Sequence, residues 1–159
     1  MMRPETVWQR RLSHGFRMAL VRFALLGTAL IFLFGCAKLT ASVPAGTELG
    51  KLKSFYVVRH ERDGRGINEL ILVDLERRGM TATTGPESAR PSTVDTIVTY
   101  EDRWMWDVTM YMLSLNISFR DGTNNTLLAS GQSYRPSLER KEPPYVVKEV
   151  LDEIFKAAK

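Results

Sequence analysis

Residues 109–119 read "TMYMLSLNISF", and this stretch decides the fold class. Every second side chain is large and apolar and those between are mostly polar; the apolar set is Tyr111, Leu113, Leu115, Ile117 and Phe119, alternating with Met112, Ser114, Asn116, Ser118 and Arg120. A period of two is typical of a β-strand with one face in a core and the other in water. The stretch therefore predicts a strand of an antiparallel sheet with one solvated face.

A hairpin partner and a helix are predicted after this strand. Asp121-Gly122 and Asn124-Asn125 supply residues that tolerate the positive φ of hairpin turns, so residues 126–134 should pair back on the strand. Pro143 and Pro144 then suit the first turn of a final helix. Its apolar stripe is Val147, Val150, Leu151 and Ile154, with Phe155 beside them.

Upstream, the runs 53–60 ("KSFYVVRH") and 94–100 ("VDTIVTY") are rich in β-branched and aromatic residues, as strands are. Between them, apolar residues recur at helical spacing and Gly79 is well placed to end the helix. Residues 80–83 are predicted to form a short strand. The helical set is Ile67, Leu70, Ile71 and Leu75.

The predicted order is β-α-β-β-β-β-α. Its economical packing is an α+β domain in which a mostly antiparallel sheet of four to five strands carries both helices on one face. A cleaved signal helix is expected before this domain. We predict three regions: a signal peptide at 1–35, a lipidated cysteine with a flexible tether at 36–52, and a periplasmic domain at 53–159.

The positive charge lies wholly in the leader. Five arginines and one glutamate precede Cys36 and account for the net charge of +4, whereas residues 36–159 carry 17 basic and 17 acidic side chains. A basic leader fits the n-region of a signal peptide. The composition therefore gives no support to a nucleic-acid partner.

The apolar run 23–35 has 13 residues, and a helix needs about 20 to cross a bilayer core. Its length and its basic flank are typical of a secretory signal. Leu33-Phe34-Gly35-Cys36 resembles the lipobox of bacterial lipoproteins, although Phe34 is bulkier than the usual residue there. The resemblance implies cleavage between Gly35 and Cys36 and acylation of Cys36. Met18 begins a compact signal of the same type and is a second candidate start.

Two other interpretations of the apolar run stay open: a buried helix with a core cysteine, and an uncleaved inner-membrane anchor. Ala37 stands where many lipoproteins of the inner membrane carry aspartate. By this resemblance we expect the outer membrane, on its periplasmic face.

The lipobox and the predicted element order together resemble small, uncharacterised proteobacterial outer-membrane lipoproteins. The likeness covers about residues 53–157. The chain is also similar in outline to periplasmic auxiliary lipoproteins of envelope assembly. It implies a membrane anchor, and an envelope protein or peptidoglycan as the partner. No catalytic residue and no cofactor come with it.

Catalytic chemistry has few candidates. His60 is the only histidine after the leader and stands at the end of a predicted strand, so we expect it in solvent rather than in a metal site or a triad. The carboxylates of Asp95, Asp102 and Asp107 support the competing hypothesis, a periplasmic hydrolase acting on cell-wall material. That hypothesis requires two of them to lie about 5–10 Å apart in a cleft.

Trp104 and Trp106, followed by Asp107, lie between two predicted strands. Tryptophans are enriched in binding hot spots, but they also cover the ends of cores, so we expect one to be buried and the other partly exposed. Our leading hypothesis is a non-enzymatic binding or accessory module without metal, which contacts its partner through Trp104, Trp106, Asp107 and the neighbouring polar sheet face. A small-ligand carrier stays a third hypothesis, because a pocket cannot be seen in a sequence.

Overall fold

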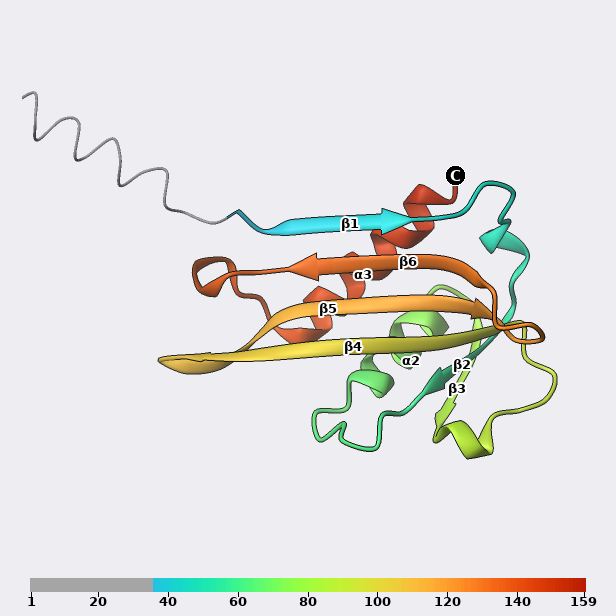
Figure 1. The fold of residues 1–159 in the computed structure, drawn as a ribbon, viewed down its shortest axis with the longest axis horizontal. Helices are drawn as coiled ribbons and strands as arrows, with labels where there is room; N and C mark the ends of the chain where they lie inside the picture. The colour runs from blue at the N-terminus through green and yellow to red at the C-terminus, as the bar shows by residue number, and fades with distance from the viewer. Residues whose placement is uncertain (1–35) are drawn as a thin grey trace, which may run out of the picture. The chain divides into compact units, whose positions relative to one another are not determined.

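A computed structural model describes residues 36–159 of the chain (Figure 1). The predicted signal helix at 1–35, with Gly35 of the cleavage site, lies outside these described residues. Within 36–159, none of the helices has the length and apolar character needed to cross a membrane.

The described residues form one six-stranded mixed sheet with two α-helices. Along the sheet the strands are ordered β1-β6-β5-β4-β2-β3. The elements are β1 (Lys38–Ser42), η1 (Leu49–Lys51), β2 (Ser54–Val58), α2 (Ile67–Arg77), β3 (Thr81–Gly85), η2 (Glu87–Ala89), β4 (Thr96–Asp107), β5 (Thr109–Asp121), β6 (Leu127–Tyr134), η3 (Ser137–Glu139) and α3 (Pro143–Ala157).

The strands β1, β6, β5 and β4 pair antiparallel, whereas β2 is parallel to both β3 and β4. Parallel neighbours need a crossover, and α2 supplies it between β2 and β3. At the start of α2, the Asp63 carboxylate accepts hydrogen bonds from the backbone N–H groups of Arg65, Gly66 and Asn68. After its last turn Gly79 has φ +82°, the left-handed conformation that ends a helix.

Both helices lie on the same face of the sheet, behind it in Figure 1. The main core lies between them, and α3 sits so close to β6 that only a glycine fits at residue 131. A Cβ atom there would lie 2.7 Å from Cγ1 of Ile154 and 3.0 Å from Cγ1 of Val150. Two ion pairs add to this packing: Arg135 with Glu149 joins the end of β6 to α3, and Arg78 with Asp152 joins α2 to α3.

The predicted α+β class, with two helices on one face of the sheet, is confirmed. The order β-α-β-β-β-β-α is also confirmed for β2 through α3. The predicted count of four to five strands is too low by one, because the prediction lacked β1. The sheet is also more mixed than expected, with two parallel pairings.

The flexible tether predicted at 36–52 is wrong at 38–42, which form β1, and at 49–51, which form η1. Lys38–Ser42 pairs with β6 along its whole length, and Ala41 packs against the core. Leu49 in η1 is buried in the same core. The folded unit therefore begins beside Cys36 rather than at residue 53.

We predict that Gly131→Ala lowers the free energy of unfolding by about 1–3 kcal/mol, because the added methyl group would force Ile154 and Val150 away from β6. Gly50→Ala is the matched control, since a Cβ atom at that position meets no atom within 4 Å. Urea unfolding of both variants measures the effect. Equal stabilities of the two variants would contradict the close packing of α3 on β6.

Candidate functional site

The face of the sheet opposite the helices is left uncovered over β1, β6, β5 and β4. A small apolar cluster around Tyr56 and Ile97 occupies only the end of this face near β2. The rest, which we call the open sheet face, bears the side chains of Thr40, Ser42, Thr99, Glu101, Asn116, Ser118, Arg120, Ser130 and Gln132.

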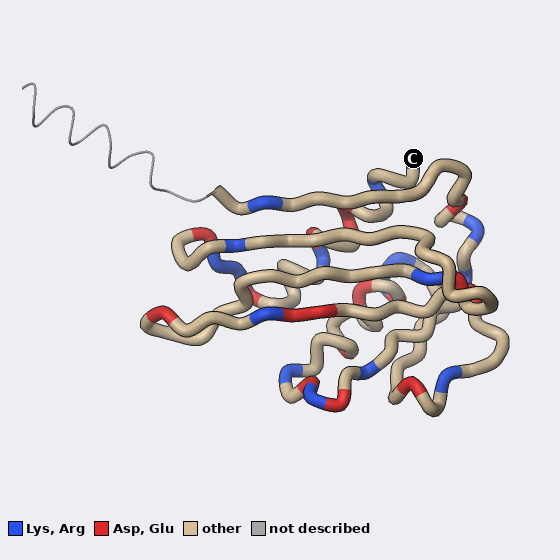
Figure 2. The backbone as a smooth tube through the Cα atoms, viewed as in Figure 1, with Lys and Arg blue, Asp and Glu red and all other residues tan. Residues whose placement is uncertain are grey.

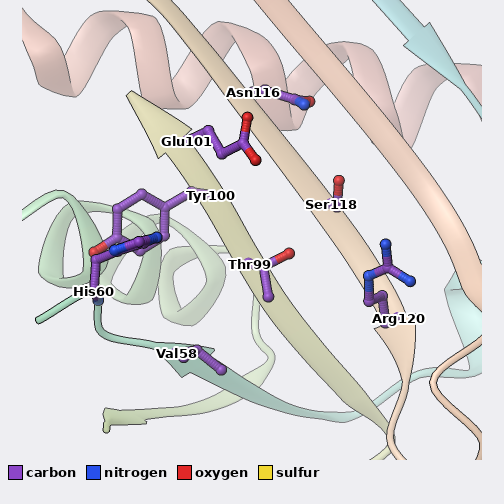
Figure 3. Close-up of a pocket in the computed structure, with 8 residues that line it drawn as sticks. All are labelled: Val58, His60, Thr99, Tyr100, Glu101, Asn116, Ser118 and Arg120. Atoms are coloured by element: carbon purple, nitrogen blue, oxygen red, sulfur yellow. The ribbon is translucent and has the colours of Figure 1, made fainter. Parts of the chain in front are cut away.

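Strand register arranges these side chains in rows across the sheet. Residues that are directly paired on one face lie about 4.5–5.5 Å apart at their Cβ atoms. One row is Thr99, Ser118, Ser130 and Ser42, and the next is Glu101, Asn116, Gln132 and Thr40. Figure 3 shows the part of both rows on β4 and β5, with Arg120 beside them. Apart from the carboxylate of Glu101 at one end, the rows form a continuous platform of hydroxyl and amide groups.

Most of this platform is uncharged. Residues 39–47 around β1, 109–119 in β5 and 127–134 in β6 include no acidic or basic residue, and Figure 2 shows these strand segments in tan. The charges of the open sheet face lie at its margins, on Lys38, Glu101, Arg103 and Arg120. Such a surface can exchange hydrogen bonds with a neutral polar ligand without the cost of removing water from many charges.

A polar cluster closes the edge of the open sheet face beside β2. His60 is exposed, as expected, and its ring meets the ring of Tyr100 edge to face at 6.1 Å. The Tyr100 hydroxyl is buried and donates a 2.6 Å hydrogen bond to Asp63. A hollow of about 310 Å³ lies between His60 and the polar side chains of β4 and β5 (Figure 3).

The ionisation of this cluster follows from its hydrogen bonds. Burial acts to raise the pKa of Asp63, but the hydrogen bonds from Tyr100 and from three backbone N–H groups outweigh it, and the pKa lies below its ordinary value. Burial, together with the bond to Asp63, raises the pKa of Tyr100. At neutral pH the pair is therefore a carboxylate and a neutral phenol.

The two tryptophans have different environments. Trp104 is half-buried: its indole N–H donates to Asp102, and the guanidinium of Arg65 lies 3.9 Å from its ring centroid. Trp106 is 68% exposed. The segment predicted as a connection is in fact the end of β4, which forms a long hairpin with β5. At its end lies the hairpin tip, which consists of Met105, Trp106, Asp107, Val108 and Met110.

The structure does not bring Asp95, Asp102 and Asp107 together. Asp102 and Asp107 lie in the extended strand β4 and Asp95 directly precedes it, so by the rise of a strand Asp95 and Asp102 are about 23 Å apart and Asp102 and Asp107 about 16 Å. Asp95 accepts hydrogen bonds from the backbone N–H groups of Lys53 and Ser54, which lower its pKa. Asp107 pairs with Ser137 of η3. These separations exceed those of the carboxylate pairs in glycosidases.

Sequence reasoning missed β1, and it predicted β6 at 126–134 without naming the side chains that β6 contributes to the open sheet face. Thr40, Ser42 and Gln132 therefore went unnamed, although "KLTASV" at 38–43 alternates polar and apolar residues as a half-buried strand does. The His, Cys, Asp and Glu side chains of the described part of the chain form no group of three or more suited to a metal ion.

Known protein families and curated proteins give no match to this chain. Solved structures do share its fold. Two PelC dodecamer structures from Paraburkholderia phytofirmans have a TM-score of 0.56, at 16% and 14% identity; they cover 74% and 75% of this chain and 97% and 98% of PelC. A DUF4136 family protein from Bacteroides thetaiotaomicron has a TM-score of 0.50 at 6% identity, covering 78% of this chain and 97% of that one. At these identities the likeness concerns the fold alone.

We predict that Tyr100→Phe costs about 1–3 kcal/mol of stability at neutral pH, because Asp63 loses its side-chain donor. The contribution of ionised Asp63 is complete above its unfolded-state pKa of about 3.9 and is lost as the pH falls through its lower folded-state pKa. The difference between wild type and variant should therefore shrink below about pH 4.

Denaturant unfolding at several pH values from about 7 to about 2.5 measures this difference. Tyr111→Phe is the control, since that buried ring makes no side-chain hydrogen bond within residues 36–159. A Tyr100→Phe cost that stays constant with pH would show that the hydrogen bond does not act through the charge of Asp63.

Proposed function

We propose that this chain is a lipid-anchored accessory module of the bacterial cell envelope, which binds an envelope component without catalysing a reaction. The single observation that carries the proposal is the open sheet face, a platform of uncharged polar groups across three strands, with both helices on the other side. An antiparallel sheet with one solvated face needs no such uninterrupted neutral platform for stability, since charged residues are tolerated there equally well.

The anchor in this proposal is Cys36, modified on its sulfur and its freed amine in the manner of the lipobox that Leu33, Gly35 and Cys36 resemble. Cys36 is exposed, and Ala37 alone separates it from β1. Acylation at this position would therefore hold the folded domain against the lipid surface instead of at the end of a long tether. We place this surface at the outer membrane, on its periplasmic side.

Peptidoglycan is the partner that best matches the open sheet face. Its glycan strands are long, extended and rich in hydroxyl and amide groups, which pair with the side chains of Asn116, Gln132 and the neighbouring Ser and Thr residues. Tyr134, which is paired with Lys38 at the end of the platform and is exposed, adds an aromatic ring that a sugar can stack on. The separations of the carboxylates along β4 favour binding over the hydrolase alternative.

A second copy of the chain is the alternative occupant of this surface. The related fold of PelC is found in dodecamers, and the sheet described here has an edge strand at each end, β1 and β3, that pairs on one side only. Head-to-tail contacts between unlike surfaces generate rings when they close.

Anchoring is tested by labelling cells with a palmitate analogue. We expect label on the wild-type protein and none on Cys36→Ala, since the chain has a single cysteine. Ala37→Asp is the matched variant: it should keep the label and move the protein to the inner-membrane fraction. An unlabelled wild-type protein, or one with an uncleaved N-terminus by mass spectrometry, would refute the anchor.

Binding is tested by co-sedimentation of the purified protein with isolated peptidoglycan. We expect the double variant Asn116→Ala and Gln132→Ala to bind on the order of tenfold more weakly, because each loses a hydrogen-bonding amide. The control is Glu76→Ala with Lys156→Ala, two exposed positions on the helix side of the sheet.

Equal binding of both double variants would reject the open sheet face as the glycan site. Mass photometry of the same samples addresses the alternative occupant. If the chain forms a ring that the Asn116→Ala and Gln132→Ala variant breaks, the face is a contact between copies of the chain, and the peptidoglycan proposal fails.

A further inference from the structure

The hairpin tip gathers apolar side chains in solvent. Trp106 is 68% exposed and Val108 83%, and nearly half of each of Met105 and Met110 is exposed. Single exposed apolar residues are ordinary, whereas a contiguous group of large ones marks a surface that another body covers.

The conformation of Val108 gives a second, independent indication. Its φ is +60°, a left-handed conformation that a β-branched residue adopts only at a cost, and hairpin turns normally use glycine, asparagine or aspartate there. Val108 has neither burial nor backbone geometry in its favour. An external apolar contact would account for valine at the outermost position of the hairpin.

The tip is held in place instead of being free to fold back. Asp107 pairs with Ser137 of η3, and Nη1 of Arg140 donates a 2.7 Å hydrogen bond to Oγ1 of Thr109. Leu138 lies in the chain between Ser137 and Arg140, which make these two contacts, and is itself 75% exposed. The hairpin and η3 together therefore form one apolar end of the domain.

Cys36 lies at this same end of the sheet. Strand register places Lys38 opposite Tyr134, Tyr134 opposite Ser114, and Ser114 opposite Arg103, in one row across four strands. From that row, the chain before Lys38 leads toward Cys36 in the same direction as β4 leads toward the hairpin tip. Figure 1 shows the start of β1 and the β4–β5 hairpin pointing to the same side.

We propose that the hairpin tip inserts into the lipid surface beside Cys36, with Trp106 at the boundary between headgroups and acyl chains. Tryptophan is enriched at that boundary, where its ring is apolar and its N–H remains near water. The choice of membrane rests on the proposed anchor, since acylated Cys36 would hold this end of the domain against the bilayer.

The charges in the tip and behind it are mixed, so the contact is apolar instead of electrostatic. Lys38 and Arg103 are basic, whereas Asp107 and Glu139 are acidic. Binding driven by these apolar side chains should persist at about 1 M salt, where screening acts over about 3 Å. With the tip in the bilayer, the strands run along the membrane normal. The open sheet face is then perpendicular to the membrane and exposed to the periplasm.

The test is the quenching of Trp106 fluorescence by brominated lipids in proteoliposomes that contain the full chain as isolated from membranes. The reporter carries Trp8→Phe and Trp104→Phe, which leaves Trp106 as the only one of the three tryptophans. We expect lipids brominated near the headgroup end of the acyl chain to reduce its emission at least about twofold, in low and in high salt. A reporter with Trp104 alone should be quenched much less, since Trp104 is packed beneath Arg65.

Val108→Asp in the Trp106 reporter should abolish most of the quenching, because a carboxylate resists burial in lipid. Leu127→Asp is the control with the same charge change on an exposed apolar residue at the opposite end of the sheet. Near-ultraviolet circular dichroism verifies the fold of both variants. Normal quenching in Val108→Asp would overturn the proposal.

Failure of this inference differs from failure of the anchor. A palmitate-labelled protein whose Trp106 is not quenched keeps the anchor and refutes insertion of the tip. An unlabelled protein whose Trp106 is quenched refutes the anchor and keeps the insertion. If photo-crosslinking from position 106 captures a protein and lipids do not quench Trp106, the tip is a protein contact and the proposal fails.

Discussion

The structure depends on the packing of both helices against one face of a strongly alternating sheet. Gly131 lets α3 approach β6, and the ion pair between Arg135 and Glu149 joins the end of that strand to the helix. Removing one partner of such a shielded pair costs far more than the pair adds, because the remaining charge stays buried without its partner. Because α2 and α3 share a single side, the other side of β1, β6, β5 and β4 stays in water.

The elements that sequence analysis predicted correctly are those specified by neighbouring residues. The alternation at 115–119, the turn residues before β6 and the apolar stripe of α3 are local patterns, and each gave the right element. β1 is different, because its partner is about 90 residues later in the chain, as the pair of Lys38 and Tyr134 shows. Pro44 and Gly46 beside it favoured a flexible tether, and the alternation of "KLTASV" is too short to predict a strand by itself.

The candidate site was predictable in kind but not in detail. Alternation ascribes Leu113 to the core, yet a bulge opposite Arg103 and Trp104 shifts the register, and Met112 takes the buried position. The predicted strand ended at Tyr100, whereas β4 continues to Asp107 and forms with β5 a hairpin that extends beyond the rest of the sheet. No local rule places Arg65 on Trp104, since that contact depends on how the loop before α2 folds over β4.

The replacement of a tether by β1 changes what an anchor at Cys36 would do. A flexible segment of sixteen residues has a root-mean-square reach of about 20–25 Å and would let the domain rotate freely above a membrane. With only Ala37 between Cys36 and β1, distance and orientation are instead set by the sheet. The apolar end and the neutral polar face then lie roughly at right angles, since one is at the strand ends and the other along the strands. A lipid surface at the first would leave the second uncovered, so the two proposed contacts do not compete for the same surface.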